Sequence, residues 1–390
     1  MATTSAPRPR LLLLFIVLAQ FTGTSLWFAG NAIMADLQRA YGLAPEALGD
    51  LTASVQLGFI TGTLVFAVLM VADRFSPSKV FWASSWIAAA CNIGVYFLAE
   101  GYYGVLLLRF ATGFFLAGIY PVGMKIAADW YSTGLGKALG YLVGALVLGT
   151  AFPHWLKHQA QSFDWQDILF FTSGLAAAGG LLIGFLVGDG PHRRQGSRFD
   201  PRAIQQIFKV KALRQAAFGY FGHMWELYAF WAFVPVFLTY YQGQTGQEFS
   251  VSLWSFFIIA IGGLGCVLGG YASLRVGSRR VAYFMLLGSG LCCLLSPLGL
   301  SLPPWLLLLF LLLWGFLVTG DSPQFSTLVA QSAPKAYIGS ALTLVNSSGF
   351  ALTIGSIQLL NWAAAQGFQS WMFLLLVPGP VFGLLNDRGH

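Results

Sequence analysis

Long apolar runs recur from Leu11 almost to the C-terminus, and they constrain the fold of this chain more than any other feature. A helix needs about 20 apolar residues to cross the hydrocarbon core of a bilayer. Only 9% of the residues are charged, whereas about 25% are charged in soluble domains. The runs are continuous instead of alternating, which favours membrane helices over a β-barrel. We therefore predict an all-α integral membrane protein.

The runs divide the chain into twelve candidate spans, which would place both termini on one side of the membrane. Of the 21 Lys and Arg residues, Arg39 and Lys157 fall on the other side and Arg109 falls inside a span. The remaining 18 (21 − 3) lie on the side of the termini. Because basic residues stay in the cytoplasm, we predict a multi-pass protein of the cytoplasmic (inner) membrane with both termini in the cytoplasm. The candidate spans are 11–35, 48–71, 80–99, 103–124, 138–157, 167–188, 214–240, 250–272, 281–300, 304–326, 337–361 and 368–385.

The N-terminus could indicate a secreted protein, and the net positive charge could indicate a nucleic-acid-binding protein. We favour neither interpretation. The basic start followed by Leu11 to Leu18 imitates a secretory signal, but the run continues to Met34 without a clear cleavage site. We interpret it as a retained first span. The net charge of +7 is explained by the cytoplasmic loops, so we expect no nucleic-acid partner. No Walker loop, nucleophile elbow or dinucleotide fingerprint occurs, and we expect no cofactor and no metal.

Two similar halves lie on either side of the polar segment 189–213. The run LMVADRFSPSK at Leu69–Lys79 aligns without a gap with GYASLRVGSRR at Gly270–Arg280, at an offset of 270 − 69 = 201 residues. GFFLAGIYP at 113–121 also matches GFLVTGDSP at 315–323, at an offset of 315 − 113 = 202 residues. The predicted parts are an N-terminal six-helix bundle at 1–188, a cytoplasmic linker with an amphipathic helix at 189–213, and a C-terminal six-helix bundle at 214–390.

The two aligned runs resemble the pattern G-x-x-x-D-[RK]-x-G-x-[RK]-[RK] of the major facilitator superfamily (MFS) of secondary transporters. The family has this pattern between the second and third membrane helices of each half. The first run has Leu69 and Ser76 in place of the glycines, and the second has Leu274 in place of the acid. The resemblance covers nearly the whole chain. It implies the MFS fold, twelve transmembrane helices in two pseudo-symmetric six-helix bundles, with substrate sites near mid-membrane between them.

The resemblance also implies a conformational switch at the cytoplasmic ends of the helices. In the family, the counterpart of Asp73 caps a helix of the opposite half through a charge–dipole contact that breaks as the halves rock. We predict that Arg74 and Asp129 join this network, with Arg275 as the matching base of the second run. In the second run Leu274 stands at the position of this acid, so the second half lacks the charge for the corresponding contact.

Ionisable residues inside the spans are functional candidates, because a charge at the bilayer centre costs about 2.5–3.5 kcal/mol on insertion scales. Glu226 lies in mid-span, and His223 shares its helical face. We hypothesise that Glu226, aided by His223, binds a proton or the substrate. The alternative is a buried structural pair of the two, and metal binding is disfavoured because no second such pair occurs. Asp321, before Pro323, is either a gating or an interfacial residue.

Arg109 and Gly113 resemble the R-x-x-x-G motif of the fourth helix in the superfamily. Arg109 either attracts an anionic substrate or responds to a protonated acid, or it pairs with backbone carbonyls for structural reasons. Both interpretations stay open at this point. Replacement of Arg109 by lysine would keep the charge and lose the forked geometry.

A polar stripe follows one face of the first span. Gln20, Thr24, Trp27 and Asn31 are spaced by four, three and four residues, which places them together on a helix. We interpret the stripe as the lining of a cavity, with hydrogen bonds between packed helices as the alternative. Weaker candidates of the same kind are Gln56, Tyr120 and Asn346.

We predict a secondary active transporter that moves a small solute across the cytoplasmic membrane by alternating access, coupled to protons. Arg109 and the scarcity of intramembrane acids favour an organic anion or metabolite. The expected partners are a small-molecule substrate, protons and membrane lipid, and we expect a monomer. Three alternatives stay open: an intramembrane enzyme using His223 and Glu226, a non-transporting receptor, and a multidrug or metabolite efflux pump with a hydrophobic cavity at Trp225, Tyr228, Phe230 and Trp231.

Overall fold

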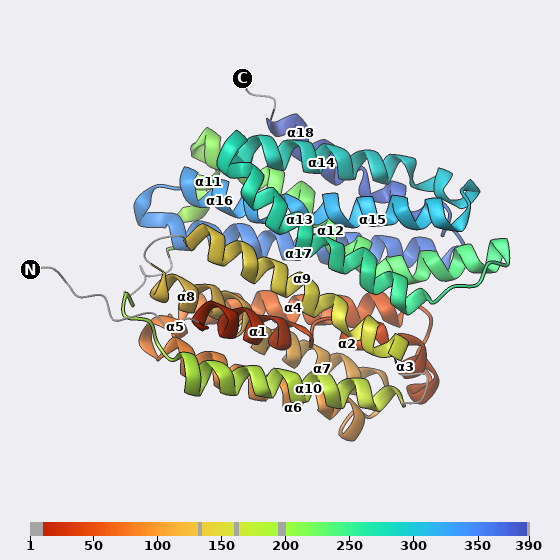
Figure 1. Ribbon diagram of the computed structural model, residues 1–390, viewed down its shortest axis with the longest axis horizontal. Helices are drawn as coiled ribbons and strands as arrows, with labels where there is room; N and C mark the ends of the chain where they lie inside the picture. Colours follow the sequence, from red (N-terminus) through yellow and green to blue (C-terminus); the bar gives the residue numbers. More distant parts are fainter. Residues whose placement is uncertain (1–10, 132–134, 160–163, 194–199, 388–390) are drawn as a thin grey trace, which may run out of the picture.

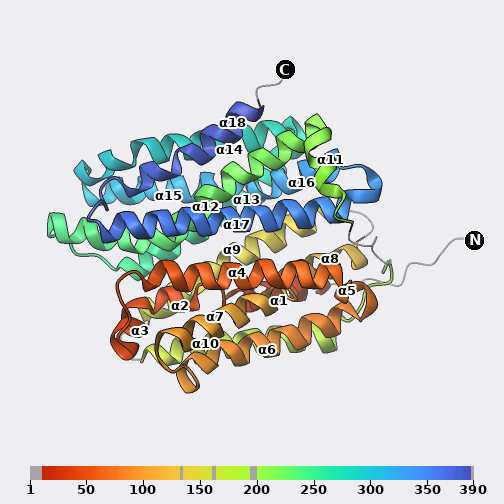
Figure 2. The same cartoon turned by 180° about the vertical axis from the view of Figure 1, so that it is seen from behind.

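The computed structural model describes residues 11–131, 135–159, 164–193 and 200–387. Within these residues the chain forms helices that lie side by side along the length of the molecule, without any strand (Figure 1). The helices before residue 190 occupy one side of the bundle and those after residue 200 occupy the other, as Figure 2 shows from behind.

The first group of helices runs from the N-terminus to the linker. It consists of α1 (Leu12–Thr24), α2 (Ala29–Ala32), α3 (Met34–Tyr41), α4 (Ala47–Val68), α5 (Val71–Arg74), α6 (Pro77–Phe97), α7 (Gly101–Leu116), α8 (Tyr120–Trp130), α9 (Leu135–Gln159), α10 (Trp165–Leu181) and the π-helix η2 (Leu182–Val187).

The second group follows the linker. It consists of α11 (Ala203–Lys209), α12 (Lys211–Thr245), α13 (Val251–Val276), α14 (Ser278–Leu295), η3 (Ser296–Ser301), α15 (Pro304–Gly320), α16 (Ser322–Ser332), η4 (Lys335–Tyr337), α17 (Ile338–Ala365), η5 (Met372–Leu376) and α18 (Pro378–Asp387). We call the end of the bundle that carries α3 the α3 end, and the opposite end, where α5, α8 and α11 lie, the linker end (Figure 1).

Nine helices in the described part of the chain are long and apolar enough to cross a membrane. The other three predicted spans coincide with α1 to α3, with the 35-residue α12, and with the short apolar stretch Met372–Asn386. The number of twelve crossings stays a prediction, as do the boundaries of the three predicted parts of the chain.

The same helix break occurs in both halves. The predicted span 103–124 is divided into α7 and α8, and the predicted span 304–326 is divided into α15 and α16. Each second helix has a proline in its first turn, Pro121 or Pro323. Proline lacks the backbone N–H and its ring obstructs the preceding turn, so it begins a helix more readily than it continues one.

Two glycines at matching positions permit the same close packing in each half. A Cβ on Gly113 of α7 would clash with the carbonyl oxygen of Val55 in α4, and a Cβ on Gly315 of α15 would clash with that of Ile258 in α13. Small residues of this kind let membrane helices approach closely. The sequence repeat is therefore also a repeat of helix contacts.

The linker helix is shorter than the predicted amphipathic stretch from 201 to 213. α11 ends at Lys209, and α12 begins at Lys211. Ile207 is buried, whereas Ile204 is 46% exposed. The backbone N–H of Asp200 donates to the hydroxyl of Ser340 at 2.9 Å, and this bond connects the middle of the linker to α17.

Candidate functional site

The two halves are joined by polar contacts at the α3 end. Asp50 of α4 accepts hydrogen bonds from the hydroxyl of Tyr102 at 2.6 Å and from the amide of Gln358 in α17 at 2.9 Å. The amide of Asn361 in α17 donates to the carbonyl oxygen of Glu46 at 2.8 Å. Because Gln358 and Asn361 belong to the second half, these bonds connect α4 and α17 across the interface.

A layer of buried aromatic rings closes the centre of the interface. Trp27, in the turn between α1 and α2, stacks on Tyr228 of α12 and on Phe350 of α17, with centroid distances of 5.7 Å in both cases. Phe28 packs edge-on against Trp231 at 6.3 Å. The indole N–H groups of Trp27 and Trp231 have no hydrogen-bond partner among the described residues. We call these five residues the aromatic layer.

The hydrophobic cavity that we predicted from four aromatic residues is only partly present. Tyr228 and Trp231 belong to the aromatic layer. Trp225 instead donates from its indole nitrogen to the carbonyl oxygen of Leu375 at 3.1 Å, and Phe230 packs against Trp314 at 4.4 Å. These two residues therefore stabilise the interior of the second half and do not line a shared cavity.

Cavities lie on both sides of the aromatic layer. At the α3 end, a vestibule of about 590 Å³ is lined by residues of α2, α3, α9, α12 and α13, among them Asn31 and Lys157. Toward the linker end, a central chamber of only about 30 Å³ remains between the halves. Such a volume holds water, but it does not hold an organic solute. The chamber is lined by polar groups from both halves, namely Tyr120, Tyr220, Thr319, Ser322, Ser326 and Asn346.

The predicted polar stripe of the first span does not share one environment. Gln20 is fully buried in α1, and its amide atoms have no hydrogen-bond partner among the described residues. The hydroxyl of Thr24 donates to the carbonyl oxygen of Gln20 at 2.8 Å. Asn31 donates to the hydroxyl of Thr52 at 2.8 Å and lines the vestibule. Gln56 of α4 is buried with both amide atoms unpaired in the described structure.

Arg109 holds the broken end of α1. Its guanidinium donates to the carbonyl oxygens of Leu26 at 3.1 Å and Trp27 at 2.6 Å, and to the side-chain oxygen of Asn92 at 2.9 Å. These carbonyls lie in the turn between α1 and α2, where no helical N–H continues the regular pattern. The contacts match the structural interpretation of Arg109 and help to position Trp27.

His223 pairs with Asp321 and not with Glu226. The imidazole Nδ1 of His223 in α12 lies 2.8 Å from the carboxylate of Asp321, and both side chains are at most 1% exposed. Asp321 connects α15 to α16, so the pair joins α12 to the helix break. The neighbours of the two residues, Tyr220 and Ser322, line the central chamber, and the pair therefore lies directly behind the chamber wall.

Glu226 lies deeper in the second half. Its carboxylate accepts a hydrogen bond from the indole of Trp314 at 2.6 Å and another from the hydroxyl of Ser289 at 2.8 Å. The side chain is fully buried. Both donors are neutral, so they satisfy the oxygens of Glu226 without supplying a countercharge. The predicted cooperation of Glu226 with His223 is thus not a direct contact.

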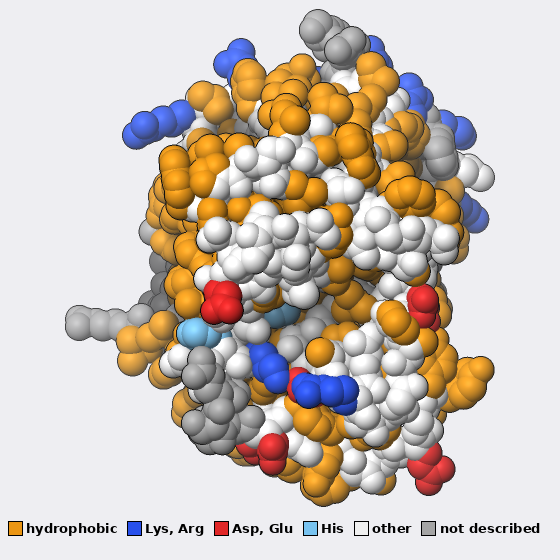
Figure 3. Space-filling model, turned by 90° about the vertical axis from the view of Figure 1, so that its right-hand side faces the viewer, with side chains coloured by type: hydrophobic (Ala, Val, Ile, Leu, Met, Phe, Trp, Pro, Cys, Tyr) orange, Lys and Arg blue, Asp and Glu red, His pale blue; other side chains and the backbone are white. Residues whose placement is uncertain are grey.

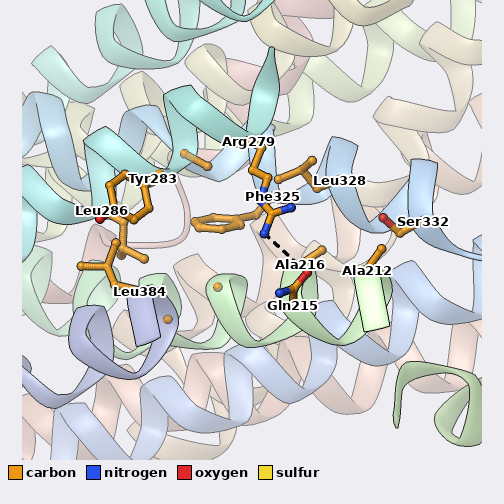
Figure 4. Close-up of a pocket in the computed structure, with 13 residues that line it drawn as sticks. Ala212, Gln215, Ala216, Arg279, Tyr283, Leu286, Phe325, Leu328, Ser332 and Leu384 are labelled. Carbon is orange, nitrogen blue, oxygen red and sulfur yellow. Dashed lines mark hydrogen bonds between the residues drawn. The ribbon is translucent and has the colours of Figure 1, made fainter. Parts of the chain in front are cut away.

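A small pocket of about 70 Å³ lies among α12, α14, α16 and α18 at the linker end (Figure 4). Phe325 lines it beside Leu286 and Tyr283, and the ring of Phe325 also packs against His223 with a centroid distance of 6.1 Å. Arg279 donates to Gln215 at the pocket rim, at 3.5 Å (Figure 4). Phe325 thus separates the buried His223–Asp321 pair from this pocket.

The predicted switch residues lie at the linker end in different environments. Lys125 of α8 lies 3.0 Å from the carboxylate of Asp73 and 4.0 Å from that of Asp129. Arg74 and Arg275 are exposed. The acids of the predicted network are therefore connected through Lys125, within the first half, and the structure does not bring Arg74 or Arg275 to them.

Asp189 adds a second tie at the linker end. It accepts hydrogen bonds from the hydroxyl of Ser76 at 2.9 Å and from the backbone N–H of Ser78 at 3.0 Å, and it pairs with Arg193 at 3.2 Å. Partial burial raises the pKa of Asp189, but these hydrogen bonds and Arg193 outweigh that effect and lower the pKa below its usual value. The carboxylate thus fastens the end of the sixth predicted span to the start of α6.

Comparison with known proteins identifies the family. The sequence profile of the Major Facilitator Superfamily matches residues 12–356. The chain belongs to the Major Facilitator Superfamily. The predicted family and fold class are confirmed, and this superfamily member is a multi-pass integral membrane protein.

Two bacterial proteins are relatives of this superfamily member. It is 25% identical over 385 residues to a Haemophilus influenzae protein named as a metabolite transport protein, covering 90% of this chain and 88% of the relative. It is also 21% identical over 287 residues to an uncharacterized protein of Campylobacter jejuni, covering 72% of this chain and 86% of the relative.

Solved structures share the fold. A bacterial homologue of the human lysosomal transporter Spinster, in an inward-facing and unoccupied conformation, has a TM-score of 0.73 at 14% identity, with 98% of both chains covered. The human organic anion transporter MFSD10 has a TM-score of 0.75 at 15% identity, with 98% of this chain and 100% of that chain covered. Identities this low support the shared fold alone.

Several residues of the site were missed from the sequence. Asn92 is a polar residue in mid-span, a signal that could have identified it, and it connects Arg109 to α10 through Thr172 at 3.1 Å. Ser289 and Trp314 contact Glu226, but a serine or a tryptophan in an apolar helix carries no distinctive signal. Asp189 was assigned to the linker, and its role depends on where the linker folds back.

Proposed function

We propose that this protein is a secondary active transporter that moves a small organic anion or metabolite across the cytoplasmic membrane by alternating access, coupled to protons. The observation that carries the proposal is the His223–Asp321 pair, which is buried at a helix break directly behind a polar chamber between the halves. Titratable side chains are costly to bury in this environment, and they are therefore functional candidates.

Alternating access is supported by the sizes of the cavities and by the contacts at the two ends. The central chamber of about 30 Å³ must open before a solute can occupy it. The hydrogen bond from Gln358 to Asp50 connects the two halves at the α3 end, and the Asp73–Lys125 pair lies at the opposite end. We place the linker end in the cytoplasm because most of the basic residues belong to it.

The buried pair of titratable side chains supports proton coupling. A proton gained or lost by this pair changes its charge, and the electrostatic interaction between the two side chains changes with it. Because Asp321 lies between α15 and α16, a weaker contact would free the helix break to move against α12. We keep Glu226 as a second proton-binding candidate, since it is buried without a cationic partner in the described structure.

The substrate class is inferred from two similar proteins and from buried polar groups. The Haemophilus influenzae relative is named for metabolite transport, and MFSD10 is titled an organic anion transporter. The amides of Gln20 and Gln56 and the indole of Trp27 have no partner in the described part of the chain. A polar ligand would satisfy them, because buried polar atoms normally have partners. Arg109 would act indirectly, by positioning Trp27.

Export of a hydrophobic compound is a second candidate, favoured by the aromatic layer at the centre of the interface. The intramembrane enzyme is disfavoured, because the family and the structural neighbours are transporters.

Ligand screening followed by reconstitution tests the proposal. Purified protein would first be screened by thermal shift against organic anions, cations and neutral metabolites, since a ligand of the folded state raises its apparent stability. The best ligand would then be tested for uptake into proteoliposomes with an imposed pH gradient. We expect a small carboxylate to stabilise the protein and its flux to follow the gradient. Stabilisation by hydrophobic cations alone would support the export candidate instead.

A further inference from the structure

The vestibule at the α3 end has a charge distribution unlike that of its surroundings. Figure 3 shows this face, with Lys, Arg and acidic side chains beside a hollow in the middle and further acidic side chains around it. Asp36 and Lys157 line the vestibule, and Arg39 contacts Asp36 from the rim at 2.6 Å. Lys157 contacts the other oxygen of the same carboxylate.

These contacts leave an excess of positive charge. Arg39 and Lys157 share the single carboxylate of Asp36, so two cations are balanced by one anion. The side chain of Lys157 is 30% exposed and that of Arg39 is 78% exposed. An anion that enters the vestibule can therefore bind Lys157 while Asp36 keeps Arg39 as its partner.

His154 supplies an unused polar group to the same cavity. It lies one turn before Lys157 in α9, lines the vestibule and is only 2% exposed. Its Nε2 atom has no hydrogen-bond partner among the described residues. A buried imidazole nitrogen without a partner is unusual in folded proteins, and a ligand in the vestibule would satisfy it. Asn31 and Tyr240 add polar groups to the lining.

We propose that the vestibule is a binding site for a small organic anion, with Lys157 as the cationic contact and His154 as the hydrogen-bonding group. The aromatic layer separates this site from the central chamber. Trp231 of the layer lines the chamber, and the next residue, Ala232, lines the vestibule. The assignment of an anion as the transported solute rests on the proposed function, whereas binding in the vestibule does not require transport.

The test uses a cysteine reporter in purified, detergent-solubilised protein. Thr239 lines the vestibule and is exposed, so Thr239→Cys reacts with a small neutral methanethiosulfonate at a rate that a bound ligand slows. The probes are benzoate, benzamide and benzylammonium, which are similar in size and differ in charge. We expect benzoate to slow the reaction at least about threefold in a saturable way, and the other two to have little effect. Gln244→Cys, on an exposed residue outside the vestibule lining, should not be protected.

Charge variants identify the residues responsible. Lys157→Gln should abolish protection by benzoate, whereas Lys335→Gln, which removes the same charge from an exposed site at the linker end, should leave it intact. Asp36→Asn should strengthen protection, and it replaces Lys157→Gln as the decisive variant if that protein does not fold. His154→Gln should weaken protection at least threefold, with His158→Gln as the matched control, because His158 contacts Ser250 and does not line the vestibule.

Two results would overturn the proposal. Equal protection by benzoate and benzamide would show an apolar site without charge selectivity, and equal behaviour of Lys157→Gln and Lys335→Gln would exclude Lys157. Because the assay measures no flux, failure of the proposed transport function would leave benzoate protection intact. Conversely, proton-coupled flux without benzoate protection would remove only the vestibule site.

Discussion

Replacement of Asp321 by asparagine tests whether the pair with His223 is an ion pair that stabilises the second half. The two groups lie 2.8 Å apart, and at an effective dielectric constant near 20 their attraction is about 6 kcal/mol. Desolvation offsets part of this attraction, and the removal of one partner from a buried pair costs about 3–5 kcal/mol. Asparagine has almost the same volume as aspartate, so the loss reflects charge and not a cavity.

Thermal unfolding of the purified protein measures the effect. For a unit of about 150–250 residues, the size of the second half, 1 kcal/mol changes the melting temperature by about 2–4 °C. We therefore expect Asp321→Asn to lower the melting temperature by at least about 6 °C. His223→Gln should lower it by a similar amount, because it leaves the carboxylate buried and uncompensated.

The double variant decides the interpretation. If the two residues form an ion pair, the Asp321→Asn and His223→Gln changes together should destabilise the protein by clearly less than the sum of the single effects. Additivity within about 0.5 kcal/mol would refute the pair, as would an Asp321→Asn protein of unchanged stability.

Three further predictions concern packing, the linker end and the break in α1. Gly113→Ala and Gly315→Ala should each destabilise the protein by about 1–3 kcal/mol, because the added methyl group meets a backbone oxygen. Gly174→Ala is the control, since Gly174 has open space around it. Melting temperatures measure the effect, and equal losses at all three positions would contradict the prediction. The lowered pKa of Asp189 means that its contacts contribute stability above its ordinary pKa of 3.8 and lose it as the pH falls through the folded-state value. Asp189→Asn should therefore speed hydrogen exchange at the start of α6 at pH 7, and the difference from the wild-type protein should shrink steadily as the pH is lowered below 3.8; a difference independent of pH would contradict this. Arg109→Lys should lower the melting temperature, because lysine cannot bind the two carbonyl oxygens in a fork. Ligand affinity should change less than threefold. A large loss of affinity in a protein of unchanged stability would instead favour direct contact between Arg109 and the substrate.

The sequence predicted the family and the repeat because both depend on local patterns. The offset of 202 residues that relates Gly113 to Gly315 also relates the breaks before Pro121 and Pro323, since proline acts on its own helix wherever the helix packs. Candidate residues such as Glu226 and Arg109 were found because charge is rare inside a membrane span.

The partners of those residues could not be predicted, because they depend on how helices distant in sequence rotate against one another. His223 and Glu226 share a face by spacing alone, yet one contacts Asp321 and the other contacts Trp314. The stripe from Gln20 to Asn31 assumed one continuous helix, and the break after Thr24 divides it. Helical periodicity gives no information beyond such a break.

Substrate-driven proton movement in proteoliposomes tests the central claim most directly. A pH-sensitive dye inside the vesicles would report protons while the ligand found by thermal shift is added outside. The account predicts that the wild-type protein moves protons with the substrate, and that Asp321→Asn retains substrate exchange but reduces proton movement at least tenfold. Substrate flux without proton movement, insensitive to an imposed pH gradient, would contradict it.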